Sequence, residues 1–143
     1  MNDWYQREKL HFAADEGDLD QVKELVEKGH DVNAFDEDLS CTPLHYAVRG
    51  GHIEVVKYLL SVGADVNAHE EAKIGETPLG SVAANCSYEM AELLVKAGAN
   101  PIIFGWMQLI ALDRARDRKK EEGRWVYALL LKGPNFTSSH ESR

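Results

Sequence analysis

The stretch from Thr42 to Asn67 constrains the fold of this chain most, because it encodes two short helices that cannot bury both apolar faces against each other. Thr42 can cap the first helix, and Pro43 suits its first position, where a missing N–H is harmless and φ is already set. We therefore predict a helix from Pro43 to about Arg49. A unit of this kind needs neighbours that cover its apolar faces.

The second helix of the unit is predicted from its apolar spacing. Two consecutive glycines at positions 50 and 51 let the backbone leave helical geometry and reverse, so this helix can start near Ile53. From Ile53 to Leu60 the apolar residues recur at helical spacing. Gly63 can adopt the left-handed conformation that ends such a helix. The unit is therefore predicted to be a pair of antiparallel helices.

The same pattern recurs along the chain. A shift of 34 residues toward the N-terminus pairs Leu44 with Leu10, His45 with His11, Gly51 with Gly17, and Asn67 with Asn33. A shift of 35 residues toward the C-terminus takes Thr42 and Pro43 onto Thr77 and Pro78. A fourth, weaker copy covers residues 110–133. A self-similar period in this range indicates a solenoid of stacked units.

The second copy resembles an ankyrin repeat of near-ideal form. The resemblance rests on the segment from Thr42 to Ala47, on Gly51 and His52, and on the segment from Gly63 to Asn67. It covers roughly residues 6–133 and weakens toward the ends, as expected of capping repeats whose outer faces meet water. It implies an all-α ankyrin-repeat solenoid of about four helix-turn-helix repeats with hairpin-like loops.

The length of 143 residues and the 44% hydrophobic content fit one domain. We expect an ankyrin repeat domain over residues 1–133, with repeats over about 6–38, 39–73, 74–106 and 107–133, and a disordered tail over 134–143. The N-terminal segment is too polar for a signal peptide, and no apolar run approaches about 18 residues. The sequence therefore predicts a cytoplasmic protein.

The copies depart from the family pattern at identifiable positions. The first copy carries Glu8 and Lys9 in place of the Thr-Pro pair, and the third carries Gly80 in place of the histidine. In the family this histidine ring hydrogen-bonds the neighbouring turn. The resemblance therefore implies structural roles for His11 and His45 instead of metal binding.

Motifs for catalysis are not found in the sequence. It holds no Gly-rich phosphate loop, no HExxH pattern and no Gly-x-Ser-x-Gly pattern. The histidines are not paired at i, i+4 on a predicted helix, and Cys41 and Cys86 form no CxxC spacing. We predict a protein that is not an enzyme, with no cofactor, no metal and reduced thiols.

Charge is distributed unevenly along the chain. The net charge is −6 over residues 1–36, −4 over 37–72, −1 over 73–104 and +3 over 105–143. The acidic first half repels nucleic acid and anionic membrane and favours encounter with a basic protein. The basic residues between Arg114 and Arg124 could touch phosphate, but interleaved acids favour a solvated face of mixed charge.

The resemblance implies a concave binding side built from the first helices of the repeats and from finger-like loops. Carried over position by position, the partner-binding candidates are Asp15, Glu16, Phe35, Asp36, Glu37, Asp38, Arg49, His69, Glu70, Glu71, Lys73, Phe104, Trp106 and Met107. Phe104 and Trp106 have an alternative role, in which they seal the third repeat against the fourth.

The predicted function is therefore a non-catalytic protein-binding module that uses the concave face and the loop fingers. The chain resembles single-domain ankyrin proteins of bacteria, some of which are immunity proteins that neutralise a basic toxin. The alternative is a regulatory or assembly adaptor that docks a cellular enzyme. In either role we expect another protein with a basic surface as partner, no nucleic acid, no membrane, and a monomer when free.

Overall fold

The computed structural model describes residues 4–70, 75–103 and 110–141, and within these ranges it describes side chains from Tyr5 to Lys132. Nine α-helices and no strand occur in the described residues. None of these helices is both long and apolar enough to span a membrane. The described architecture confirms the all-α prediction.

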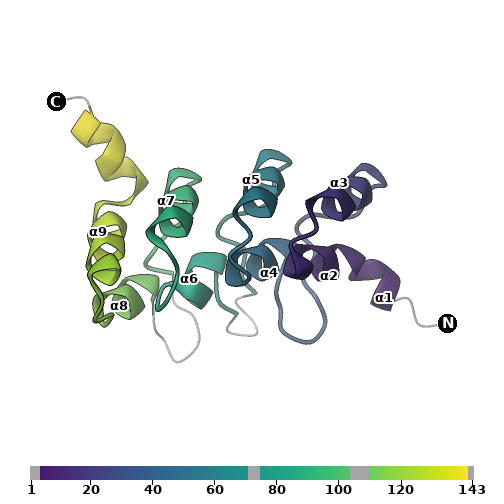
Figure 1. The fold of residues 1–143 in the computed structure, drawn as a ribbon, viewed down its shortest axis with the longest axis horizontal. Helices are drawn as coiled ribbons and strands as arrows, with labels where there is room; N and C mark the ends of the chain where they lie inside the picture. The colour runs from purple at the N-terminus through teal and green to yellow at the C-terminus, as the bar shows by residue number, and fades with distance from the viewer. Residues whose placement is uncertain (1–3, 71–74, 104–109, 142–143) are drawn as a thin grey trace.

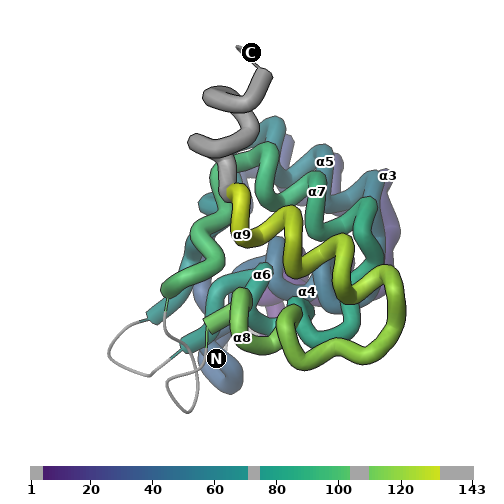
Figure 2. Tube along the Cα trace, turned by 90° about the vertical axis from the view of Figure 1, so that its left-hand side faces the viewer, coloured from purple at the N-terminus to yellow at the C-terminus, as the bar shows by residue number. Residues whose placement is uncertain are grey.

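The helices form four pairs after a short leading helix, α1 (Trp4–Arg7). The pairs are α2 (Lys9–Glu16) with α3 (Leu19–Glu27), α4 (Pro43–Arg49) with α5 (Ile53–Ser61), α6 (Pro78–Val82) with α7 (Tyr88–Lys96), and α8 (Ala111–Arg116) with α9 (Glu121–Glu141). Figure 1 shows the first helix of each pair in one row, here called the inner helices, and the second in another row, the outer helices. Figure 2 shows the outer helices one behind another, as in a solenoid.

Helix α4 begins where local chemistry predicts. The Thr42 hydroxyl accepts a hydrogen bond from the backbone N–H of His45 at 3.4 Å, while the Thr42 N–H donates to Nδ1 of the His45 ring at 3.0 Å. Pro43 occupies the first helical position, where it needs no hydrogen-bond acceptor. Thr77 and Ser87 cap α6 and α7 through their hydroxyls in the same way. Short polar motifs therefore set the starts of these three helices.

A continuous apolar core runs through the stack from Leu10 to Leu130. Each of the first three repeats buries one leucine on its inner helix and one on its outer helix, namely Leu10 and Leu25, Leu44 and Leu59, and Leu79 and Leu94. All six are at most 3% exposed. Each repeat thus covers the apolar face of the next, which is the reason an isolated pair could not be stable.

Histidine rings bond backbone carbonyls, His11 within the first repeat and both His45 and His52 between repeats. The His11 ring donates through Nε2 to the carbonyl of Ala34 at 2.7 Å, and the His45 ring donates to the carbonyl of Glu76. His52 reaches back to the first repeat, where its Nε2 donates to the carbonyl of Asp15 at 2.8 Å. The rings satisfy carbonyls of loops and helix ends, in agreement with the structural roles that the resemblance implies.

Asparagine side chains form a second set of links, which we call the asparagine ladder. The Asn33 amide donates to the carbonyl of Gly63 at 3.0 Å, and its oxygen accepts the N–H of Asp65 at 2.7 Å. Asn67 makes the same pair of bonds to the backbone of the third repeat, at 3.1 and 2.7 Å. One side chain thus satisfies a donor and an acceptor of the following repeat.

The asparagine ladder ends at Ile102. The Ile102 N–H donates to the Asn100 side chain at 3.0 Å, as the Asn67 N–H donates to the Asp65 side chain at 2.9 Å. Ile102 therefore occupies the ladder position of the third repeat, but its side chain has no amide. It is 59% exposed.

The third and fourth repeats are joined differently. Gly80 replaces the linking histidine, and Arg114 of α8 donates to the Gly80 carbonyl at 2.7 Å and forms an ion pair with Glu76. Glu122 of α9 accepts the backbone N–H of Tyr88, at the start of α7, at 2.8 Å. Charged side chains thus hold the last repeat where histidine and asparagine hold the others.

The last helix passes the predicted domain boundary. The sequence predicts a domain ending at residue 133 and a disordered tail over 134–143, whereas α9 continues to Glu141. Because side chains are described only to Lys132, disorder of the tail stays a prediction.

Candidate functional site

The segment between α3 and α4, residues 34–41, forms a loop that projects beyond the row of inner helices (Figure 1), and we call it the first finger. The N–H of Asp36 donates to the carbonyl of Cys41 at 2.9 Å and closes the loop. The carboxylate of Asp36 points inward, where Oδ1 accepts the N–H groups of Leu39 and Cys41, both at 3.0 Å. The finger therefore has a fixed shape.

Side chains of helix α4 hold the finger in place. The Tyr46 hydroxyl donates to Oδ2 of Asp36, so both carboxylate oxygens are satisfied. The guanidinium of Arg49 lies 4.9 Å from the centre of the Tyr46 ring, and its Nη2 contacts the Cys41 sulfur at 3.4 Å. Asp36, Cys41, Tyr46 and Arg49 thus form one connected cluster.

The protonation states of this cluster follow from burial and hydrogen bonding. Burial would raise the pKa of Asp36, but hydrogen bonds from Tyr46 and from the amides of Cys41 and Leu39 outweigh it, so this pKa is lowered. Burial and the bond to Asp36 raise the pKa of Tyr46. Burial also raises the pKa of Cys41 despite the nearby Arg49. The cluster therefore holds a carboxylate, a neutral phenol and a neutral thiol, without an activated nucleophile.

Asp36, one of the partner-binding candidates, is not an exposed acid. Its side chain is buried, with only 4% of the residue exposed, and all of its described bonds are internal. The reason is that two backbone N–H groups of a tight loop and a tyrosine hydroxyl converge on one carboxylate. Asp36 therefore positions the finger through internal hydrogen bonds.

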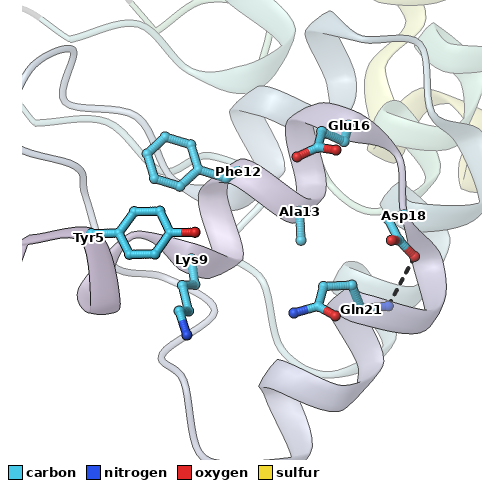
Figure 3. A pocket seen from close by; sticks show the side chains of 7 residues that line it. All are labelled: Tyr5, Lys9, Phe12, Ala13, Glu16, Asp18 and Gln21. Carbon is cyan, nitrogen blue, oxygen red and sulfur yellow. Dashed lines mark hydrogen bonds between the residues drawn. The ribbon is translucent and has the colours of Figure 1, made fainter.

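Glu16 lies at the far end of α2 from the first finger, beside a shallow hollow of about 290 Å³. Figure 3 shows this hollow with Tyr5 and Phe12 on one side and Asp18 and Gln21 on the other. The Tyr5 and Phe12 rings are stacked with centroids 5.7 Å apart. The hollow runs along α2, because both Lys9, the first residue of this helix, and Glu16, its last, line it.

The other described candidates differ in exposure and in their contacts. Asp15, Phe35, Glu37, Asp38 and Arg49 are exposed, whereas His69 and Glu70 are half-buried. Glu37 forms an exposed ion pair with Arg7, and its N–H donates to the Glu8 carboxylate at 3.1 Å. The structure thus brings the candidates of the first finger together with Arg49. The contacts it describes do not join Asp15 to them.

Five candidates lie outside the described residues. These are Glu71, Lys73, Phe104, Trp106 and Met107. Their assignment to the binding face stays a prediction, as does the alternative in which Phe104 and Trp106 seal the third repeat.

Sequence reasoning missed Leu39, which has 58% of its surface exposed and lies in the first finger. The available signal was an apolar residue between the polar residues Asp38 and Ser40 in a predicted loop. Tyr5 and Phe12 were also missed as exposed aromatic side chains. Phe12 occupies the repeat position of Tyr46, which was a usable signal.

In the described part of the chain, no group of three or more His, Cys, Asp or Glu side chains could hold a metal ion. Cys41 and Cys86 are free and buried. The arrangement provides exposed acidic and apolar side chains on a preformed scaffold. Such a surface is suited to contact with another macromolecule.

Comparison with known proteins identifies a family. A family model described as ankyrin repeats in three copies matches residues 10–104, which is more than half of the chain. The matched region contains α2 from Leu10 onward, the inner helices α4 and α6, the first finger, and both Asn33 and Asn67 of the asparagine ladder. No curated protein matches.

Proposed function

Because this chain belongs to the ankyrin repeat family, whose members generally serve as scaffolds for protein–protein interaction, we propose that it binds a basic partner protein and catalyses no reaction. The proposed contact surface is the inner-helix side with the first finger. The observation that carries the proposal is the acidic surface of the first two repeats beside a finger fixed by buried hydrogen bonds.

Charge and rigidity both favour such a contact. The net charge of −6 over residues 1–36 and −4 over residues 37–72 attracts a basic surface and speeds encounter. The finger is already ordered by Asp36, so little conformational entropy is lost on binding. Fast association and a low ordering cost are what a stoichiometric binder needs.

We further propose that binding neutralises the partner, as an immunity protein neutralises a toxin, and that the chain is a cytoplasmic monomer when free. The acidic first half supports a basic toxin or effector as partner and disfavours nucleic acid and anionic membrane. The two free, buried cysteines are in keeping with a reducing compartment.

The test begins with capture of a partner from an extract of the source cells on the immobilised chain. The purified pair is then studied by biolayer interferometry at low and high salt. We expect high salt to slow association, because exposed charges are screened beyond about 10 Å at 0.1 M. The variant with Glu37→Lys and Asp38→Lys should associate about tenfold more slowly.

The matched control carries Asp20→Lys and Glu54→Lys, the same change in charge on the exposed side of outer helices α3 and α5. Equal slowing of both variants would show that net charge acts and that the finger does not form the contact. Titration of the partner's activity with the chain separates two roles. Stoichiometric loss supports neutralisation, whereas unchanged activity supports an adaptor.

A further inference from the structure

We propose that Leu39 is the anchor of the binding surface, inserting into an apolar pocket that basic side chains surround on the partner. This inference rests on the proposed protein-binding function and assigns the contact to one side chain. Leu39 is 58% exposed, the highest exposure among the large apolar side chains described in the first two repeats.

The fold holds Leu39 outward. Its N–H donates to the buried Asp36 carboxylate at 3.0 Å, and its carbonyl accepts a weak bond from the Cys41 thiol at 3.5 Å. Both backbone groups of Leu39 are therefore satisfied inside the finger, while its side chain remains in water. The side chain of Leu39 therefore contributes little to the stability of the fold, because more than half of the residue is exposed.

The next residue, Ser40, reinforces this geometry. Ser40 has φ 54°, and in the described chain it is the only residue other than glycine with positive φ. This left-handed conformation is unfavourable for a residue with a side chain, and such strain is concentrated at functional sites. On the far side of Ser40, the Cys41 N–H donates to the Asp36 carboxylate and the Cys41 carbonyl accepts the Asp36 N–H, and these two bonds hold the turn in place. The fold thus tolerates a strained turn directly behind an exposed leucine.

The surroundings of Leu39 indicate the chemistry of the partner. Glu37 and Asp38 precede it and are exposed, and no basic residue occurs in residues 34–41. Two cations lie beside the finger, Arg7 in an ion pair with Glu37 and Arg49 in contact with Cys41, and three carboxylates of the finger itself outnumber them. A pocket that accepts an isobutyl group and lies within reach of two carboxylates is expected to carry lysine or arginine on its rim. Burial of the anchor supplies affinity, and the carboxylates set its orientation.

Site-specific photo-crosslinking tests the inference. A benzophenone amino acid is placed at position 39 in one variant and, as a matched control, at Val62, which is 37% exposed at the end of outer helix α5. Cross-linked peptides from the captured partner are identified by mass spectrometry. The purified partner is then titrated with wild type, Leu39→Ala and Val62→Ala.

We expect cross-links from position 39 and none from position 62, to a partner segment that combines apolar residues with lysine or arginine. Leu39→Ala should weaken binding at least about tenfold, mainly by faster dissociation, with an unchanged melting midpoint. Val62→Ala should bind like wild type.

Two results would overturn the inference in different ways. A partner that binds Leu39→Ala within about threefold of wild type, yet loses affinity when Glu37 and Asp38 are reversed, rejects the anchor and retains the binding function. Failure of the wild-type chain to bind any protein rejects the proposed function together with the anchor.

Discussion

At the scale of single residues, one carboxylate determines the shape of the first finger. Replacing Asp36 with alanine should lower the free energy of unfolding by about 1–3 kcal/mol, because the N–H groups of Leu39 and Cys41 and the Tyr46 hydroxyl lose their acceptor. Urea unfolding measures this loss. Asp38→Ala, an exposed neighbour, should change stability by less than about 0.5 kcal/mol. Equal losses in the two variants would mean that the finger is not held by Asp36.

His45 makes stability depend on pH. Burial lowers its pKa from the ordinary 6.5 to about 4, and its Nδ1 lone pair already accepts the Thr42 N–H. Between these values the unfolded chain binds a proton that the folded protein excludes. Stability is therefore full above pH 6.5 and falls as pH drops toward 4, by up to about 3 kcal/mol.

The measurement is urea unfolding of wild type and His45→Gln from neutral pH downward. The variant should be less stable at neutral pH and should show a flatter decline on acidification, because it cannot take up the proton. Parallel curves for the two proteins would assign the acid sensitivity to other groups.

At this scale, a contact could be predicted from the sequence when the residues that make it are close together along the chain. The cap formed by Thr42 and His45 was predictable, because the residues that make it are neighbours in sequence. The burial of Asp36 was not, because an acid in a polar loop is usually exposed, and its tyrosine partner stands on the following helix. A loop without periodicity offers no pattern from which such a contact can be read.

At the scale of elements, the third repeat shows where a repeated pattern stops being informative. Helix α6 has five residues, whereas α4 has seven. Gly51 turns the chain after α4 with φ 73°, but Cys86 stands in that position after α6. His52 bridges the first two repeats, whereas Ser87 caps its own helix, and a hollow of about 360 Å³ lies between the second and third repeats. The repeat period thus predicted that α6 exists. It did not predict the shorter length of α6, which goes with the different turn between α6 and α7.

The junction with the fourth repeat depends on Arg114. Its side chain is 18% exposed and pairs with Glu76, which is 22% exposed. Arg114→Ala should lower the free energy of unfolding by about 2–3 kcal/mol, because the Glu76 carboxylate and the Gly80 carbonyl lose their donor in a largely buried place. Hydrogen exchange should show α8 and the described start of α9 opening first.

The control for this junction is Arg116→Ala, because Arg116 is an exposed arginine of the same helix that pairs with Asp113 at 3.3 Å. Arg116→Ala should lower the free energy of unfolding by less than about 0.5 kcal/mol. If Arg116→Ala destabilised the chain as much as Arg114→Ala, the exposed charges would be holding the repeat and the buried pair would not.

At the scale of the whole molecule, stability is shared between neighbouring repeats. Leu59 is fully buried in the continuous core, so Leu59→Ala should lower the free energy of unfolding by about 2–5 kcal/mol. Leu39→Ala removes the same atoms from an exposed side chain and should leave the melting midpoint unchanged. Thermal unfolding followed by circular dichroism compares them. A small change in the melting midpoint of Leu59→Ala would mean that Leu59 does not lie in the core and that the repeats are aligned in a different register.

The end of the asparagine ladder decides where this architecture could be lengthened. An additional copy of residues 34–67 placed after Asn33 would meet Asn33 on one side and present its own asparagine on the other, so every new junction would reuse existing hydrogen bonds. A copy placed after Ile102 would leave a backbone N–H and carbonyl facing an aliphatic side chain. A copy of residues 34–67 inserted after Asn33 would therefore keep the asparagine ladder continuous, whereas the same copy placed after Ile102 would interrupt it.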